Sequence, residues 1–175
     1  MKRVPNYLIP LAFTALATIQ STPYAAVDMF LKIGDIKGES LDKTHRDEID
    51  VLAWSWDLSQ SADPRNPIVR PLSVTKYMDL SSPVLYDYLL TNKMADEAIL
   101  TVRKAGTDPL EYVIITMTGV TVTTASTGGA EGEDRITENI SLNFSSACVK
   151  YTPQDATGTP GTSIQTCWTF DGGVP

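Results

Sequence analysis

The sequence has few of the side chains that hold transition metals, because its 175 residues include one histidine and two cysteines. A zinc site needs three or four such ligands, so the composition argues against zinc enzymes and zinc-dependent folds. Basic residues are also scarce, since 14 Lys and Arg face 21 Asp and Glu and the formal charge is −7. A chain of this charge repels phosphate, and non-specific binding to nucleic acid is therefore disfavoured.

Catalytic motifs are missing as well. The sequence contains no glycine-rich phosphate loop with its lysine, no dinucleotide-binding fingerprint and no metalloprotease helix. His45 is the single histidine available as a base, and its charged neighbours favour a solvated loop residue over a catalytic one. The spacing of Glu131, Glu133 and Asp134 does not match a calcium loop and indicates a solvated turn. We therefore predict no catalytic, cofactor-binding or metal-binding residues, and a protein that is not an enzyme.

The remaining composition is that of one folded domain. Apolar residues make up 42% and charged residues 20% of the chain, which is typical of soluble globular proteins. A chain of this length can bury one substantial core but not two comfortable ones. We therefore expect a single compact unit after any targeting segment is removed.

The beginning of the chain differs from the rest, since it carries two basic residues and no acidic residue up to Ala25. An apolar run of about a dozen residues lies within it, and small residues follow near its end. The run is shorter than the about 20 residues of a membrane-spanning helix. This pattern predicts a secretory signal peptide over residues 1–25, cleaved to leave a domain over residues 26–175. An uncleaved membrane anchor is the alternative.

Alternation of apolar and polar residues predicts that most of the domain is β-structure. Between Ile49 and Leu58, for example, one face carries Leu52, Trp54, Trp56 and Leu58. The two tryptophans could form a ligand platform, but sharing a face with two leucines favours a buried core. The expected strands span Met29–Ile33, Ile49–Leu58, Ile68–Thr75, Ala98–Lys104, Tyr112–Thr123, Ile136–Tyr151 and Cys167–Phe170.

Other features interrupt the strands. Ser82 as N-cap and Pro83 as first helical residue predict a short helix that ends near Asn92. The stretch Gly34–Asp47 has no periodicity, and loops of this length in compact domains are usually functional or disordered. A segment rich in Gly, Pro and Thr lies near residues 152–163. The elements together predict a mainly β fold, a small β-barrel of two packed antiparallel sheets with one short α-helix.

The two cysteines bear on the redox state. Export would place Cys148 and Cys167 in an oxidising compartment, where two cysteines often pair. A bridge between them would close a loop of about 20 residues and contribute roughly 3 kcal/mol in the chain-entropy model. We predict this disulfide, and the alternative is a pair of buried free thiols that never meet.

Several blocks of the sequence resemble the haemolysin-coregulated proteins (Hcp), which build the inner tube of the bacterial type VI secretion system. The most specific block is Glu48–Trp56. Other blocks lie before and after it, in the same order as in the family, and together they span residues 26–170. They are Ala26–Ile33, Gly38–Ser40 with Asp42 and His45, Lys76-Tyr77 with Asp79, Ser82-Pro83 with Leu85, Leu100–Gly106, Glu111-Tyr112, Gly132–Arg135 running into Thr137–Phe144, and Tyr151 with Pro153-Gln154 and Trp168.

This resemblance implies a small β-barrel with a helix at its side, assembled as a homohexameric ring. Rings of the family stack into a tube that leaves Gram-negative cells, carries small effector proteins in its lumen and works with sheath and spike proteins. The family brings no catalytic residues. The stretch Gly34–Asp47 would be the loop that reaches the next ring. Its candidate contact residues are Lys37, Glu39, Asp42, Lys43, His45, Arg46 and Asp47.

Two features depart from the family pattern. Family members normally lack a cleavable signal, whereas here the resemblance starts at Ala26, directly after the predicted cut. In addition, Asp63–Pro67 replaces a stretch that is glycine-rich in many relatives, and the two cysteines are unexpected. We predict an exported, ring-forming Hcp-like protein in the periplasm or outside the cell, with no membrane contact after cleavage. The alternative is a periplasmic or extracellular binding module that reuses the barrel without building a tube.

Overall fold

The computed structural model describes residues 27–62, 67–104, 109–155 and 158–170, and the mainly β fold with one short helix is confirmed. The predicted signal peptide lies outside these residues, as do positions 63–66 of the segment that departs from the family pattern. The elements are β1 (Val27–Ile33), β2 (Ile49–Ser55), β3 (Leu58–Ser59), β4 (Ile68–Val69), β5 (Leu72–Tyr77), α1 (Ser81–Thr91), β6 (Met94–Lys104), β7 (Leu110–Gly128), β8 (Thr137–Asn143), β9 (Ser146–Tyr151) and β10 (Ile164–Thr169).

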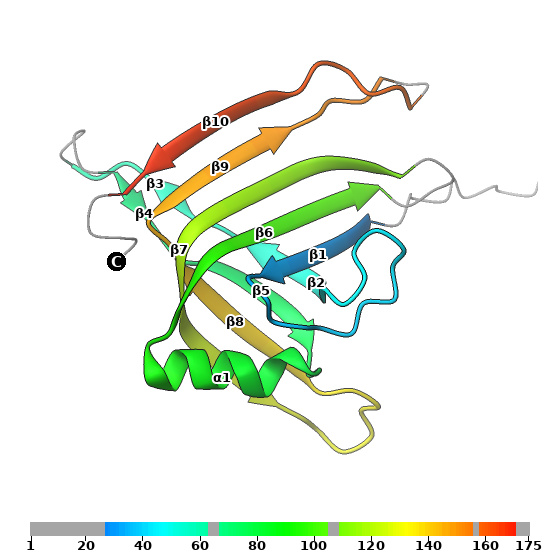
Figure 1. Ribbon diagram of the computed structural model, residues 1–175, viewed down its shortest axis with the longest axis vertical. Helices are drawn as coiled ribbons and strands as arrows, with labels where there is room; N and C mark the ends of the chain where they lie inside the picture. The colour runs from blue at the N-terminus through cyan, green and yellow to red at the C-terminus, as the bar shows by residue number, and fades with distance from the viewer. Residues whose placement is uncertain (1–26, 63–66, 105–108, 156–157, 171–175) are drawn as a thin grey trace, which may run out of the picture.

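Six strands close into a barrel (Figure 1). Their order is β7-β6-β1-β2-β5-β8, and β8 pairs again with β7, so the sheet closes on itself. β9 and β10 form a ribbon outside this closure, because β9 pairs with the first half of β7 and β10 extends the sheet beyond β9. Closure removes the free edges that an open sheet would expose, and it leaves β10 as the edge of the ribbon.

The barrel interior is filled by side chains that alternate along the strands. In β5, Leu72, Val74 and Lys76 are buried, whereas the residues between them are half-buried on the outer face. The largest of the apolar side chains that are almost fully enclosed, among the described residues, are Leu31, Ile33, Ile49, Leu72, Leu85, Leu100, Ile115, Met117, Ile140, Leu142 and Phe144.

The predicted strand Ile136–Tyr151 is interrupted at Phe144 and Ser145, between β8 and β9. Both halves pair antiparallel with β7, and the interruption lies beside Gly119, whose φ is 60°. A Cβ at this glycine would lie 2.5 Å from Ser145 Oγ, so a side chain there has no room. Before the interruption even-numbered residues such as Ile140 and Leu142 face the interior. After it an odd-numbered residue, Ala147, is buried. Alternation alone does not reveal such a shift.

The prediction that Leu52 and Leu58 lie in the core with the tryptophans is wrong. Their exposed fractions are 40% and 55%. A bulge after Val51 shifts the register of β2 against β5. Val51 therefore faces the core, whereas Leu52 faces outward. Trp54 and Trp56 return to the inner side after the bulge and pack half-buried against the core.

Helix α1 lies beside the barrel and ends as predicted, because Asn92 adopts the left-handed conformation that stops a helix. Its start differs from the prediction. Ser82 belongs to the first turn and is buried, and Asp79 Oδ1 instead accepts the N–H of Ser81 at 2.9 Å. Within the described ranges, no helix has the length and apolar character to cross a membrane.

Candidate functional site

The loop between β1 and β2, here called the rim loop (Gly34–Asp47), folds back on itself. The Gly38 N–H donates to Asp47 O at 2.8 Å, and the Ser40 N–H donates to Glu48 O at 3.0 Å. A Cβ at Gly38 would lie 2.3 Å from Glu48 O, so glycine is required for this approach of two backbones. The rim loop is therefore a closed turn with its own ladder of backbone hydrogen bonds.

Arg103 of β6 fastens the rim loop to the barrel. Its Nη2 lies 2.5 Å from Asp42 Oδ2 and 2.9 Å from Asp28 Oδ2, and its Nη1 lies 3.1 Å from Asp42 Oδ1. Asp42 Oδ1 also accepts the backbone N–H groups of Thr44 and His45. The hydrogen bond from Arg103 is the largest of the effects that hold the pKa of Asp42 well below its usual range.

His45 is buried, so the prediction of a solvated histidine is wrong. Its ring stacks on Phe30 with centroids 4.2 Å apart and an interplanar angle of 9°. Nδ1 lies 2.9 Å from Glu48 Oε2, and Nε2 lies 3.2 Å from Glu111 Oε1. Because both ring nitrogens face carboxylates and no nucleophile is among these contacts, the arrangement fixes the loop and does not resemble a catalytic base.

The predicted contact residues of the rim loop fall into two groups. Asp42 and His45 bind the barrel, and Glu39 Oε1 accepts the backbone N–H of Leu80 at 3.2 Å. The remaining four are exposed, and two of them form a loose pair, Lys37 Nζ to Asp47 Oδ2, at 4.0 Å. The exposed candidates are Lys37, Lys43, Arg46 and Asp47.

A second ionic cluster, which sequence reasoning missed, lies beneath α1. Lys76 Nζ is fully buried, 2.5 Å from Glu138 Oε1 and 2.8 Å from Asp79 Oδ1. Ser82 Oγ and Tyr86 Oη each donate to the Glu138 carboxylate at 2.5 Å. A signal was present, because strand alternation places Lys76 after Leu72 and Val74, and Glu138 before Ile140, on inward positions. Alternation alone does not identify such a cluster, because charged residues are almost never fully buried unless paired.

Opposing effects act on the acidic groups of this cluster. Burial raises the pKa of Glu138. The hydrogen bonds from Lys76, Ser82 and Tyr86 together lower it by more, and the resulting pKa is below the usual value. Burial, followed by the hydrogen bond to Glu138, raises the pKa of Tyr86 to about 12. Glu138 is therefore a carboxylate at neutral pH while the Tyr86 hydroxyl keeps its proton, and the cluster joins the start of α1 to β5 and β8.

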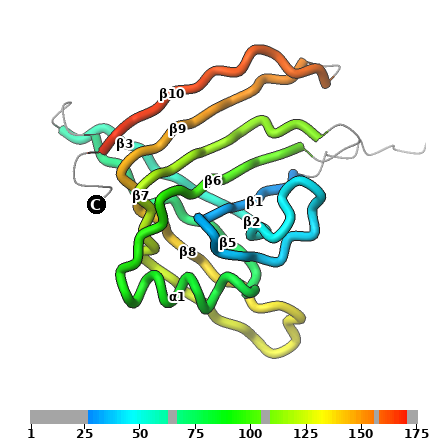
Figure 2. Tube along the Cα trace, in the orientation of Figure 1, coloured from blue at the N-terminus to red at the C-terminus, as the bar shows by residue number. Residues whose placement is uncertain are grey.

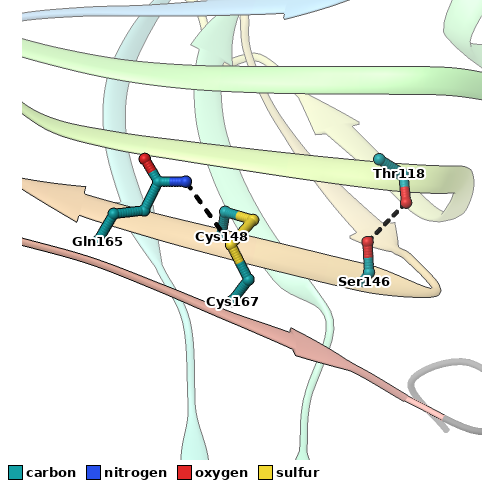
Figure 3. The surroundings of a disulfide bond; sticks show 5 residues. All are labelled: Thr118, Ser146, Cys148, Gln165 and Cys167. Atoms are coloured by element: carbon teal, nitrogen blue, oxygen red, sulfur yellow. Dashed lines mark hydrogen bonds between the residues drawn. A yellow bond between two sulfur atoms is a disulfide. The ribbon is translucent and has the colours of Figure 1, made fainter.

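The two cysteines meet in the ribbon outside the barrel. Cys148 of β9 and Cys167 of β10 stand opposite each other in the strand register and form a disulfide (Figure 3). Gln165 Nε2 lies 3.6 Å from Cys167 Sγ. The bond links the edge strand covalently to its neighbour, in addition to their backbone pairing.

An apolar cleft of about 320 Å³ lies where the β3–β4 hairpin approaches the end of β10. Of its aromatic residues, Trp56 is half-buried, and its indole N–H finds no acceptor among the described residues. Apart from the ligand platform considered for the two tryptophans, local sequence does not indicate this cleft, because its walls come from three separate parts of the chain. The cleft is lined by Trp56, Leu58, Ser59, Gln60, Pro67, Ile68, Val69, Trp168 and Phe170.

No group of three or more His, Cys, Asp or Glu side chains placed to hold a metal ion occurs in the described ranges. The notable features are thus the anchored rim loop, the disulfide-linked ribbon and the apolar cleft. Exposed charged and apolar surfaces of this kind suit contacts between macromolecules.

Comparisons with known proteins give the family. Residues 30–151 match the family model described as "Type VI secretion system effector, Hcp". The chain is 52% identical over 142 residues to Protein hcp1 of Pseudomonas aeruginosa. This match covers 76% of this chain and 88% of the relative. The resemblance inferred from the sequence blocks is therefore confirmed.

Solved structures agree with this assignment. Hcp1 from Salmonella typhimurium is 36% identical with a TM-score of 0.73, and the match covers 84% of this chain and 96% of that one. A type VI secretion system effector from Yersinia pestis is 35% identical with a TM-score of 0.71, covering 81% and 99%. The barrel, the helix and the sequence blocks all match those of Hcp proteins. This chain belongs to the Hcp family of type VI secretion proteins.

Proposed function

We propose that this protein is a structural component of a type VI secretion tube, built as a homohexameric ring that stacks head to tail. Family membership supports the tube role, since the family is one of secreted structural proteins. The observation that carries the stacking proposal is the rim loop, which Arg103 fastens to the barrel and which presents Lys37, Lys43, Arg46 and Asp47 to solvent. The comparisons do not favour the alternative of a binding module.

Two interfaces are needed for this assembly. A head-to-tail contact between neighbours closes into a ring when its rotation closes, and a second contact along the ring axis can repeat without limit. The rim loop suits the second contact because its exposed Lys37, Lys43, Arg46 and Asp47 can form mixed-charge pairs with another ring. Each such pair contributes about 0–1 kcal/mol, and six copies at each ring junction act together.

Native mass spectrometry tests ring formation, and sedimentation tests stacking. We expect a six-subunit species, and higher salt should shorten stacks before it breaks rings because exposed charges are screened while the buried ring interface is not. A monomer at micromolar concentration would contradict the proposal.

The rim loop should be probed by point substitution. Replacing the whole loop with a Gly/Ser link would also remove the buried Ile36, Ser40 and His45, and it would therefore confuse stacking with folding. The double variant Lys43→Glu, Arg46→Glu changes only exposed side chains, and we expect hexamers with fewer stacks. The matched control is Lys93→Glu, an exposed lysine after α1, which should leave stacking unchanged.

We also propose that the signal peptide is cleaved after Ala25 and that the protein acts outside the cytoplasm. The basic, acid-free start with its short apolar run supports this. N-terminal sequencing of exported protein should read Ala26, and thiol titration under denaturing, non-reducing conditions should find no free sulfhydryl. Protein that starts at Met1 and stays in the membrane would contradict the cleavage proposal, and two free thiols would contradict the disulfide in the cell.

A further inference from the structure

The two ends of the molecule carry complementary apolar features. Leu41 at the tip of the rim loop has an exposed fraction of 84%. The apolar cleft lies at the opposite end, as the separation of the rim loop from the β3–β4 hairpin shows (Figures 1 and 2). The register agrees, since Asp42 of the rim loop binds Arg103 near the end of β6, whereas the cleft includes Phe170 after the end of β10.

Leu41 cannot easily turn back onto its own barrel. The Ser40 N–H bonds to Glu48 O at 3.0 Å, and the Asp42 carboxylate is held by Arg103 and by two backbone N–H groups. Both neighbours of the leucine are thus fixed, and its side chain remains in water in an isolated subunit. A large apolar side chain on a rigid, charged loop is a typical anchor for a contact with another molecule.

The cleft has the size and lining to receive such an anchor. Its volume of about 320 Å³ exceeds the space of one leucine side chain, and tryptophan, phenylalanine and aliphatic side chains form its walls. Exposed charges of both signs adjoin the lining residues in sequence, because Asp57 lies between Trp56 and Leu58 and Arg70 follows Val69, with the Arg70 N–H donating to Asp57 O at 3.0 Å. Lys43 and Arg46 follow the leucine in the rim loop, are exposed and have no ion-pair partner among the described residues, so they are available to pair with a carboxylate of another copy.

We infer that Leu41 of one copy enters the apolar cleft of the next copy along the tube, with the basic residues beside it pairing with Asp57. The occupant is a second copy of this chain because tip and cleft lie on opposite ends, which is the arrangement that a head-to-tail contact repeats without limit. This inference rests on the proposed stacking of rings and names the surface that receives the rim loop.

Cysteine crosslinking tests the contact directly. The full chain, as the cell processes it, would carry Leu41→Cys together with Ser59→Cys, a small exposed residue that lines the cleft. Mild oxidation should give a ladder of covalent multimers on a non-reducing gel. The matched control pairs Ser59→Cys with Leu90→Cys, because Leu90 on α1 is also exposed, at 83%, but lies away from the rim loop. Equal ladders from both pairs, or no ladder from either, would overturn the inference.

A second experiment separates this inference from the proposed function. Leu41→Ser should leave hexamers intact and lower the association constant for stacking by roughly tenfold or more, as expected when a leucine loses its burial. Leu90→Ser should change stacking less than twofold. If hexamers never form, the proposed function fails. If hexamers stack normally with Leu41→Ser, only the inference fails and the rim loop contacts another surface. Binding of a small apolar probe to the cleft that leaves stacking unchanged would also overturn the inference.

Discussion

The cluster beneath α1 and the cluster at the rim loop contain the same kinds of groups but differ in burial. Lys76 and Glu138 are fully enclosed, whereas Asp28 and Asp42, the partners of Arg103, have side chains that are 38% and 20% exposed. In the interior, an unpaired charge cannot regain water, so each partner depends on the others. At the rim, water can replace a lost partner. The buried cluster therefore determines stability, and the rim cluster determines the shape of the loop.

Removing the buried cation should have the largest effect. Lys76→Met keeps the length of the side chain but leaves Glu138 and Asp79 without their cation in the interior. We expect a loss of about 3–5 kcal/mol in the free energy of unfolding, measured by urea titration. The control Lys93→Met removes an exposed lysine and should change stability by less than about 0.5 kcal/mol. A loss below about 1 kcal/mol for Lys76→Met would show that burial does not distinguish the clusters.

Removing the rim cation should cost less. Arg103→Met leaves Asp28 and Asp42 near water, so we expect a loss of about 2 kcal/mol, in the range for hydrogen bonds to charged groups. Amide hydrogen exchange at residues 40–47 should become faster while exchange in β5 and β8 is unchanged. If the whole barrel exchanged faster to the same degree, the rim cluster would be part of the core and not a fastening of the loop.

Acid should weaken both clusters, because each contains a carboxyl group whose pKa is lowered in the folded state. The pKa values of Asp42 and Glu138 are lowered in the folded state, so their contribution is complete above the unfolded value near 4 and is lost as pH falls toward the folded pKa. Stability should thus be level near pH 6 and fall below about pH 5. Asp42→Asn should remove about 1 kcal/mol of this fall between pH 6 and pH 3, measured by urea titration at each pH. An unchanged slope would mean that Asp42 titrates normally.

The smallest effect is expected for the exposed pair of the rim loop. Lys37 and Asp47 have side chains that are 70% and 58% exposed, and their charged atoms are 4.0 Å apart. Lys37→Ala should change the free energy of unfolding by less than about 0.5 kcal/mol, because such pairs gain little over hydration. A thermal melt of the variant beside the unchanged protein is sufficient. A loss comparable to that of Arg103→Met would show that exposure is a poor guide in this loop.

Much of the fold could be predicted from local patterns. Alternation in the segments around Leu72–Tyr77 and Thr137–Asn143 marks strands because a strand has only two faces. Asn92 marks the end of the helix because it tolerates the left-handed conformation. The long aperiodic stretch Gly34–Asp47 was correctly placed outside the strands, and the Hcp blocks led to the right family.

The candidate site was less predictable. His45 stands among charged residues in the sequence, and nothing local shows that Phe30 and Glu111 enclose it in the fold. The cleft brings Trp56 next to Trp168, more than a hundred positions away. A bulge and a two-residue interruption changed the faces of two strands, because a shift of one residue reverses every later side chain.

The sequence by itself determined the β-rich class, the helix end, the family and the absence of familiar catalytic motifs, because these depend on residue types and short spacings. Only the tertiary structure decided which charges are buried, which residues of the rim loop reach solvent and where the apolar cleft lies. Those properties depend on which distant strands become neighbours. Closure of β7 onto β8 encloses Glu138 with Lys76, and the position of Arg103 beside Asp42 leaves Leu41 exposed. Burial and electrostatics are set by such neighbours, so local sequence cannot specify them.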